Sequence, residues 1–143
     1  MFLGQYQHSI DPKGRVVLPS RFREALADGC VVTKGQERCL YVFPLDRWAE
    51  EVTQFETLPR TDARARQLSR TFFAGATQQE LDKQGRVQLP TSLRDYAGLE
   101  KELAVIGVSD RVEIWDAAEW RTYNTAADEY YSNIEEALSA DGI

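Results

Sequence analysis

The sequence predicts an α+β fold in which a small β-barrel is built from two tandem repeats with pseudo-twofold symmetry and carries helices at its periphery. The block Asp11–Pro19 returns as Asp82–Pro90, 71 residues later. Each copy contains short runs of alternating apolar and polar residues, which are typical of strands with one buried face. Two copies are too few for a solenoid, which needs about three units. A pair of repeats that share one core is therefore favoured.

The repeat extends well beyond this block. Matching residues run from Phe2 to Trp120 in the same order in both halves, and after one inserted residue Trp48 corresponds to Trp120. We expect a first repeat over residues 1–58, a connecting helix over 59–75, and a second repeat with a C-terminal helix over 76–143. Four strands alone leave exposed edges, and two interleaved copies would close them into a barrel.

Each unit has the same predicted order of elements: strand, turn, strand, short helix, two strands and a helix. Pro19 and Pro90 begin the short helices, because proline suits a first helical turn. Gly29 and Gly98 end these helices, where a left-handed residue is common. The expected strands are 6–10, 15–18, 31–34, 40–43, 77–81, 86–89, 103–108 and 112–115, and the longer helices are 45–55, 62–73 and one from about 117.

The last helix is amphipathic, since its apolar residues recur every three or four positions. This stripe either packs against the β-units or contacts a neighbouring subunit. The apolar residues are Trp120, Tyr123, Ala127, Tyr130, Ile134 and Ala137, and the acidic residues of the opposite face are Glu119, Asp128, Glu129, Glu135 and Glu136.

The repeated block contains a turn with a defined chemistry. Aspartate first, proline second and glycine fourth, as in 11–14, is the pattern of a type I turn. The aspartate side chain can accept backbone N–H hydrogen bonds within the turn, and glycine can adopt the positive φ that rejoins the next strand. We therefore expect four residues to shape the two turns: Asp11, Gly14, Asp82 and Gly85.

Neither turn requires the arginine that follows it. Arg15 and Arg86 could each form an ion pair with the aspartate of their own turn. Alternatively, they could contact phosphates or base edges, because a planar guanidinium suits phosphate and guanine geometry. Nearby cations on the turns and the following helices would widen such a patch: Lys13, Arg21, Arg23, Lys83 and Arg94.

Charge is distributed unevenly along the chain. The formal net charge is −6, yet residues 1–75 carry +2 and residues 76–143 carry −8. Overall charge bears on solubility and long-range steering, and one face can still be basic. A nucleic-acid partner therefore remains compatible with this acidic sequence.

Several classes of protein are disfavoured. The sequence contains no run of about 18 apolar residues, so no membrane span is predicted. Its N-terminal residues lack the features of a secretory signal. We therefore expect a cytoplasmic protein. Cys30, Cys39 and the single His8 do not form a zinc ligand set, and both cysteines are expected in the core. The sequence has neither a nucleophile–histidine arrangement nor a phosphate-binding glycine loop. We predict no metal, no cofactor and no enzymatic activity.

At these residues the sequence resembles the AbrB/SpoVT-like transcription factors and, among them, the MraZ family very closely. The resemblance rests on the paired motifs Asp11–Arg15 and Asp82–Arg86, the tandem arrangement, the start Met1–Gly4 and the total length. It covers nearly the whole chain. The doubled motif is specific, whereas a single copy would not be.

The resemblance implies a bacterial regulator that binds repeated boxes in double-stranded DNA upstream of its own operon, the division and cell-wall gene cluster. It also implies a ring-shaped homo-oligomer that is cytoplasmic and associated with the nucleoid. By this resemblance the DNA-facing residues are Lys13, Arg15, Lys83 and Arg86, with Arg21 and Arg23 nearby. Gln84 replaces the lysine of the first turn, so the first turn is expected to be the stronger contact.

Two alternatives share parts of this pattern. An antitoxin with the same β-unit would also bind its own promoter, although such proteins usually append a flexible tail where this chain has a second folded copy. A ring-forming structural or adaptor protein would use the acidic helix face for a protein partner. DNA retention during purification distinguishes the adaptor from the regulator.

Overall fold

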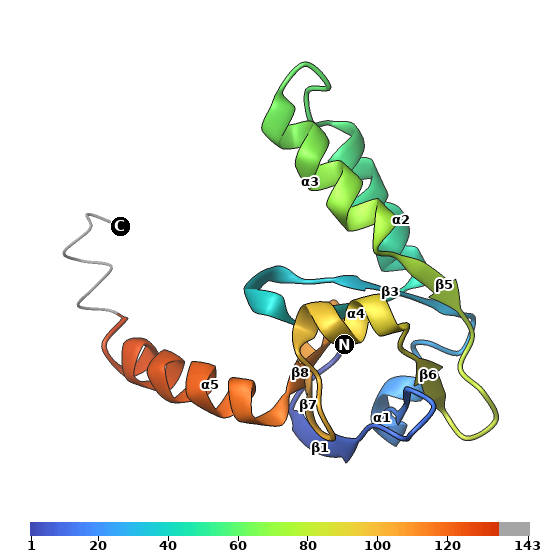
Figure 1. Cartoon of the computed structure of the whole chain (residues 1–143), viewed down its shortest axis with the longest axis vertical. Coiled ribbons are helices and arrows are strands. Elements are labelled where there is room, and N and C mark those ends of the chain that lie inside the picture. The colour runs from blue at the N-terminus through green and yellow to red at the C-terminus, as the bar shows by residue number, and fades with distance from the viewer. Residues whose placement is uncertain (135–143) are drawn as a thin grey trace.

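The computed structural model describes residues 1–134, and its two repeats interleave in one body from which helices project (Figure 1). The strands are β1 (Gln5–Ser9), β2 (Arg15–Val17), β3 (Cys30–Lys34), β4 (Leu40–Pro44), β5 (Thr77–Gln79), β6 (Arg86–Gln88), β7 (Glu102–Val108) and β8 (Arg111–Asp116). The helices are α1 (Ser20–Arg23), the 3-10 turn η1 (Gln36–Arg38), α2 (Leu45–Glu56), α3 (Ala63–Ala74), α4 (Thr91–Ala97) and α5 (Ala117–Ser132). These elements follow the predicted order.

The main sheet has six antiparallel strands in the order β1-β7-β8-β4-β3-β5. Exchanging every strand with its counterpart in the other repeat reproduces this order, which is the pseudo-twofold symmetry that the duplicated sequence predicts. The first repeat supplies β1 to β7 of the second, and the second supplies β5 to β3 of the first. Each repeat therefore completes the sheet of the other.

A separate two-stranded ladder joins the halves a second time. In it β2 pairs with β6, and Val16 lies opposite Val87, its counterpart in the repeat. Both valines are fully buried. The flanking pairs are Arg15 with Gln88 and Val17 with Arg86. Because side chains alternate along a strand, these four flanking residues share the outer face of the ladder.

The predicted barrel is not formed, because the sheets do not close. β1 and β5 remain the edges of the main sheet, and the residue after β1, Ile10, forms only an isolated bridge to Val16 of β2. The turns carry the chain out of the main sheet, and β2 and β6 have three residues each. Such strands span only about 10 Å, and they pair with one another rather than with an edge of the main sheet. The short edge strands limit unwanted pairing with other chains.

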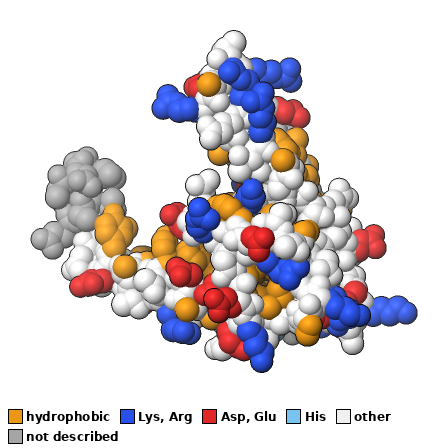
Figure 2. All heavy atoms as spheres, in the orientation of Figure 1, with side chains coloured by type: hydrophobic (Ala, Val, Ile, Leu, Met, Phe, Trp, Pro, Cys, Tyr) orange, Lys and Arg blue, Asp and Glu red, His pale blue; other side chains and the backbone are white. Residues whose placement is uncertain are grey.

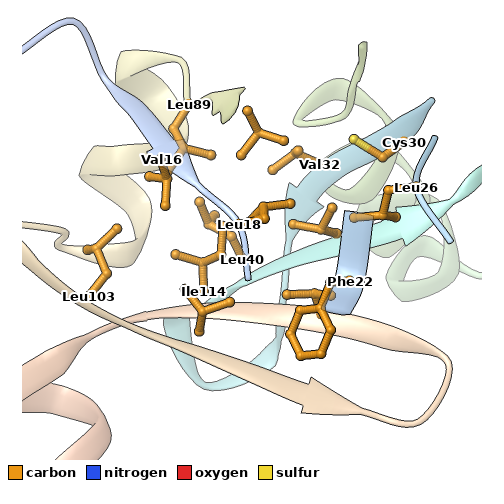
Figure 3. Close-up of a cluster of buried hydrophobic side chains, with 14 of the residues drawn as sticks. Val16, Leu18, Phe22, Leu26, Cys30, Val32, Leu40, Leu89, Leu103 and Ile114 are labelled. Carbon is orange, nitrogen blue, oxygen red and sulfur yellow. The ribbon is translucent and has the colours of Figure 1, made fainter. Parts of the chain in front are cut away.

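The core lies between the ladder and the main sheet and draws on both repeats (Figure 3). Phe22 of α1 is 2% exposed, and its ring packs edge-on against Phe2 and Tyr6, with centroids 5.2 and 5.4 Å away. The other residues labelled in this cluster are Val16, Leu18, Leu26, Cys30, Val32, Leu40, Leu89, Leu103 and Ile114. One shared core of this kind couples the folding of the two halves.

Cys30 and Cys39 are buried with free thiols, as expected for core residues. Burial raises the pKa of the Cys30 thiol to about 11. Burial, followed by the nearby Glu113 carboxylate, also raises the pKa of Cys39. Both thiols are therefore protonated at neutral pH, which makes them poor nucleophiles.

Two helical projections leave the body (Figure 1). α2 and α3 form a hairpin, and Asp62 caps the start of α3, because its side chain accepts a hydrogen bond from the Arg64 N–H. α5 extends in another direction, and the side chain of Asp116 caps it by accepting from Glu119 N–H. The predicted stripe residue Ala137 and the acidic residues Glu135 and Glu136 lie outside the described residues. Across residues 1–134, no helix combines the length and apolar character required to cross a membrane.

Candidate nucleic-acid interface

The first turn is organised by one carboxylate. Asp11 Oδ1 accepts hydrogen bonds from the backbone N–H groups of Lys13 at 2.9 Å and Arg15 at 2.8 Å. Its Oδ2 accepts from Arg15 Nε at 2.7 Å. The Gly14 N–H closes the turn onto the Asp11 carbonyl at 2.9 Å, with Gly14 at a φ of +80°. A residue with a side chain rarely adopts that backbone conformation.

The second turn repeats this geometry. Asp82 Oδ1 accepts from the backbone N–H groups of Gln84 and Arg86, each at 2.9 Å. Asp82 Oδ2 accepts from Arg86 Nε at 2.7 Å, and Gly85 N–H donates to the Asp82 carbonyl at 2.9 Å. The loss of the proline found in the first turn therefore leaves the hydrogen bonding unchanged.

The ion pair considered as an alternative role is present in both turns. In each pair the arginine Nε donates to the aspartate, so the two terminal nitrogens of the guanidinium can make other contacts. The Arg15 side chain is 30% exposed and that of Arg86 is 22% exposed. Arg86 Nη1 also lies 3.9 Å from Asp11 Oδ2, which shows that the two turns adjoin one another. The aspartates thus orient the arginines without covering them.

Each turn is docked on the opposite repeat. The Leu89 N–H donates to the Gly14 carbonyl at 2.8 Å, and the Leu18 N–H donates to the Gly85 carbonyl at 3.0 Å. A Cβ on Gly14 would lie 3.1 Å from Arg94 Cζ. A Cβ on Gly85 would overlap the side chain of Arg23. Glycine is favoured at both turns by the positive φ, which is +80° at Gly14 and +75° at Gly85, and the opposite repeat leaves little space for a side chain.

This docking places a second arginine beside each turn. Arg23 donates from Nε to the Leu18 carbonyl at 3.0 Å, and Arg94 donates likewise to the Leu89 carbonyl at 3.0 Å. Arg94 therefore stands beside the first turn and Arg23 beside the second. The sequence identifies both arginines as neighbours of the turns, but it does not show that each serves the turn of the other repeat.

The remaining predicted cations lie at the surface. Lys13, Lys83 and Arg21 are exposed, with the two lysines at the turn tips and Arg21 on α1. Gln88, which sequence reasoning did not select, donates from Nε2 to the Lys13 carbonyl at 2.7 Å. Gln88 belongs to the interface because it lies opposite Arg15 in the β2–β6 ladder. This strand register is set by the folded structure and could not be identified from the sequence. The described residues contain no cluster of three or more metal-ligating side chains.

The pKa values of both turn carboxyls lie below the ordinary value for aspartate. Hydrogen bonding from the Arg15 N–H lowers the pKa of Asp11, and the Arg86 N–H lowers the pKa of Asp82 in the same way. A lowered folded-state pKa gives stability that is present above the unfolded value of 3.8 and is lost as pH falls through the folded-state value. We expect NMR titration of the carboxyl carbons to place both midpoints below 3.8. Midpoints at or above 3.8 would contradict this turn geometry.

A protein-family model matches the chain twice, over residues 1–71 and again over 72–141. Its description is "MraZ protein, putative antitoxin-like". The chain belongs to the MraZ family of transcriptional regulators. This confirms the family resemblance of the doubled motif. It also supports the prediction of a non-enzymatic protein, because the family consists of regulators rather than enzymes.

Curated relatives match over nearly the full length. A protein of Desulforamulus reducens named "Transcriptional regulator MraZ" is 52% identical over 138 residues, covering 96% of this chain and 97% of its own. Relatives of the same name from Desulfitobacterium hafniense and Moorella thermoacetica are each 49% identical. The alignment covers 100% of both chains for the former and 96% of both chains for the latter.

Proposed function

We propose that the chain is a sequence-specific DNA-binding regulator that recognises repeated boxes in double-stranded DNA upstream of its own operon, the division and cell-wall gene cluster. The observation that carries this proposal is the paired turn. Two arginines, oriented by aspartates, adjoin on one face, and each has a second arginine from the opposite repeat beside it. A regulator of this kind acts in the cytoplasm at the nucleoid.

The shape of the β2–β6 ladder supports DNA binding. The major groove of B-DNA accepts a two-stranded antiparallel ribbon, and a forked guanidinium can pair with the O6 and N7 atoms of guanine. The outer face of this ladder presents Arg15, Arg86 and Gln88. Lys13 and Lys83 at the turn tips would contact phosphates, which position the protein without reading sequence.

Assembly into a ring would multiply this contact. One subunit offers few cations, so its affinity would be modest and sensitive to salt. When several identical turn pairs on one assembly meet several spaced boxes, each further contact becomes intramolecular and benefits from a high effective concentration. A homo-oligomeric ring is therefore part of the proposal.

Footprinting on the DNA upstream of its own gene tests the proposed function. We expect the protein to protect short repeated sequences at a regular spacing, at concentrations that leave unrelated DNA unprotected. Uniform protection without preferred sites would indicate only nonspecific binding to phosphates. That result, or the absence of protection, would contradict sequence-specific regulation.

A further inference from the structure

The helices that end the two repeats are equivalent, but within residues 1–134 only the first of them is covered by another helix. α2 follows β4 as α5 follows β8, and Trp48 corresponds to Trp120. In the first repeat α3 packs on α2. The Phe72 ring stacks on Phe55 with centroids 4.3 Å apart and on Trp48 at 5.3 Å. The second repeat has no equivalent of α3 within residues 1–134.

In the outer half of α5, the aromatic residues have no partner ring among the described residues. Near the body, Trp115 packs against Trp120 at 5.2 Å and Tyr123 at 4.9 Å. Further out, Tyr130 is 57% exposed and Tyr131 is 75% exposed. Figure 2 shows apolar side chains exposed along this projection. Large exposed aromatic groups that lie close together mark interaction surfaces.

The α2/α3 hairpin offers a matching groove at its outer end. The groove has a volume of about 330 Å³, and its apolar lining includes Phe55, Leu58 and Phe73. Arg66 and Arg70 of α3 also line it. Figure 2 shows Lys and Arg side chains gathered at the end of this hairpin. An aromatic ring would fill the apolar part, and a neighbouring carboxylate would meet the arginines.

Charge is complementary between α5 and the groove of the hairpin, whose lining holds Arg60, Arg66 and Arg70 against Glu56. Residues 59–75 hold four arginines and one acidic residue, a net charge of +3. Residues 117–134 hold three acidic residues and one arginine, a net charge of −2. Asp128 lies one helical turn from Tyr131, on the same side of α5, and Glu129 directly precedes Tyr130 in the sequence. The acidic groups therefore accompany the rings that would enter the groove.

We propose that α5 of one copy docks onto the α2/α3 hairpin of a second copy, with Tyr130 and Tyr131 in the groove and Asp128 and Glu129 beside Arg66 and Arg70. The partner's hairpin then covers α5, as α3 covers α2 within one chain. α5 has 16 residues and is about 24 Å long. Because the two surfaces differ, the contact is head-to-tail, and such contacts build rings when the rotation closes. This inference rests on the assembly part of the proposed function.

The test uses two variants of the full chain without DNA. One variant carries Arg66→Glu and Arg70→Glu, and the other carries Tyr130→Ala and Tyr131→Ala. Light scattering on wild-type protein is expected to give a multiple of the 16.3 kDa subunit mass. Each variant is expected to shift to the monomer mass while retaining its circular dichroism spectrum. Wild-type mass in either variant would overturn the proposal.

Mixing the two variants makes the test specific. The arginine variant retains an intact α5, and the tyrosine variant retains an intact hairpin. In their mixture, α5 of the arginine variant can dock onto the hairpin of the tyrosine variant, and no other docking contact is possible. The mixture is therefore expected to form a one-to-one dimer. If the mixture stays monomeric, the proposed pairing is wrong, whatever the single variants do.

A Lys13→Glu and Lys83→Glu variant serves as the control, since it changes the net charge as much as the hairpin variant does. It is expected to retain the wild-type mass and to lose DNA binding. Loss of the wild-type mass in this control would overturn the assignment of assembly to the hairpin and α5. The control therefore separates a failure of the assembly surface from a failure of the proposed DNA contact.

Discussion

Replacing Arg15 or Arg86 by alanine is expected to weaken binding to the upstream DNA by about 10- to 100-fold, which corresponds to ~1–3 kcal/mol for a lost bidentate contact. The ion pairs with Asp11 and Asp82 are partly exposed to solvent, and ion pairs near the surface contribute only about 0–1 kcal/mol to folding. The variants should therefore fold, and the loss should appear in binding. Gel-shift titration at fixed salt measures it.

The matched control is Arg121→Ala, which removes an exposed arginine from α5, on a different element from the turns. We expect it to bind with wild-type affinity. If Arg15→Ala and Arg86→Ala also bind with wild-type affinity, the turn arginines serve only their own aspartates. Comparison of the two variants also ranks the turns. The sequence favours the first, although each turn has an arginine from the opposite repeat beside it.

The largest expected loss of stability follows from Phe22→Ala. Phe22 is 2% exposed and packs between the Phe2 and Tyr6 rings in the shared core. Truncating a buried phenylalanine to alanine costs about 3–5 kcal/mol, because apolar contacts are lost and a cavity remains. This is a large part of the ~5–15 kcal/mol that stabilises a typical domain. Urea unfolding at one fixed protein concentration should show the loss.

Leu68→Ala provides the comparison, because Leu68 is 45% exposed on α3. We expect its free energy of unfolding to stay within about 1 kcal/mol of the wild-type value, in line with partly exposed apolar sites. A similarly small loss for Phe22→Ala would show that α1 is not held by the shared core.

The elements of this fold could be predicted from local pattern, whereas their pairing could not. Alternation located the strands, and the prolines located the starts of the short helices, since these signals act over a few residues. Gly98 ends α4 as predicted, but the prediction for Gly29 was wrong, because α1 already ends at Arg23. The exchange of β1 and β5 between repeats depends on contacts between residues far apart in sequence. A repeat offset does not specify such contacts. The predicted barrel was wrong for the same reason, because closure depends on how far the turns carry β2 and β6 from the main sheet.

The site was predicted in part. The turn chemistry follows directly from the positions of Asp11 and Gly14, and the structure contains the corresponding hydrogen bonds. The placement of Arg94 beside the first turn follows only from the crossed docking of the repeats. Gln88 likewise joins the outer face only through the register of β2 and β6.

The central claim is that the paired turns contact DNA, and the salt dependence of binding tests it most directly. The dissociation constant for the upstream DNA is measured across a range of salt concentrations for wild type and for a variant that carries both Lys13→Ala and Lys83→Ala, which removes the proposed phosphate contacts of both turns. Each lost phosphate contact lowers the slope of log affinity against log salt by about one. If the paired turns contact DNA, the variant binds with a weaker affinity and a shallower slope. An unchanged affinity with an unchanged slope would contradict a DNA contact by the turns.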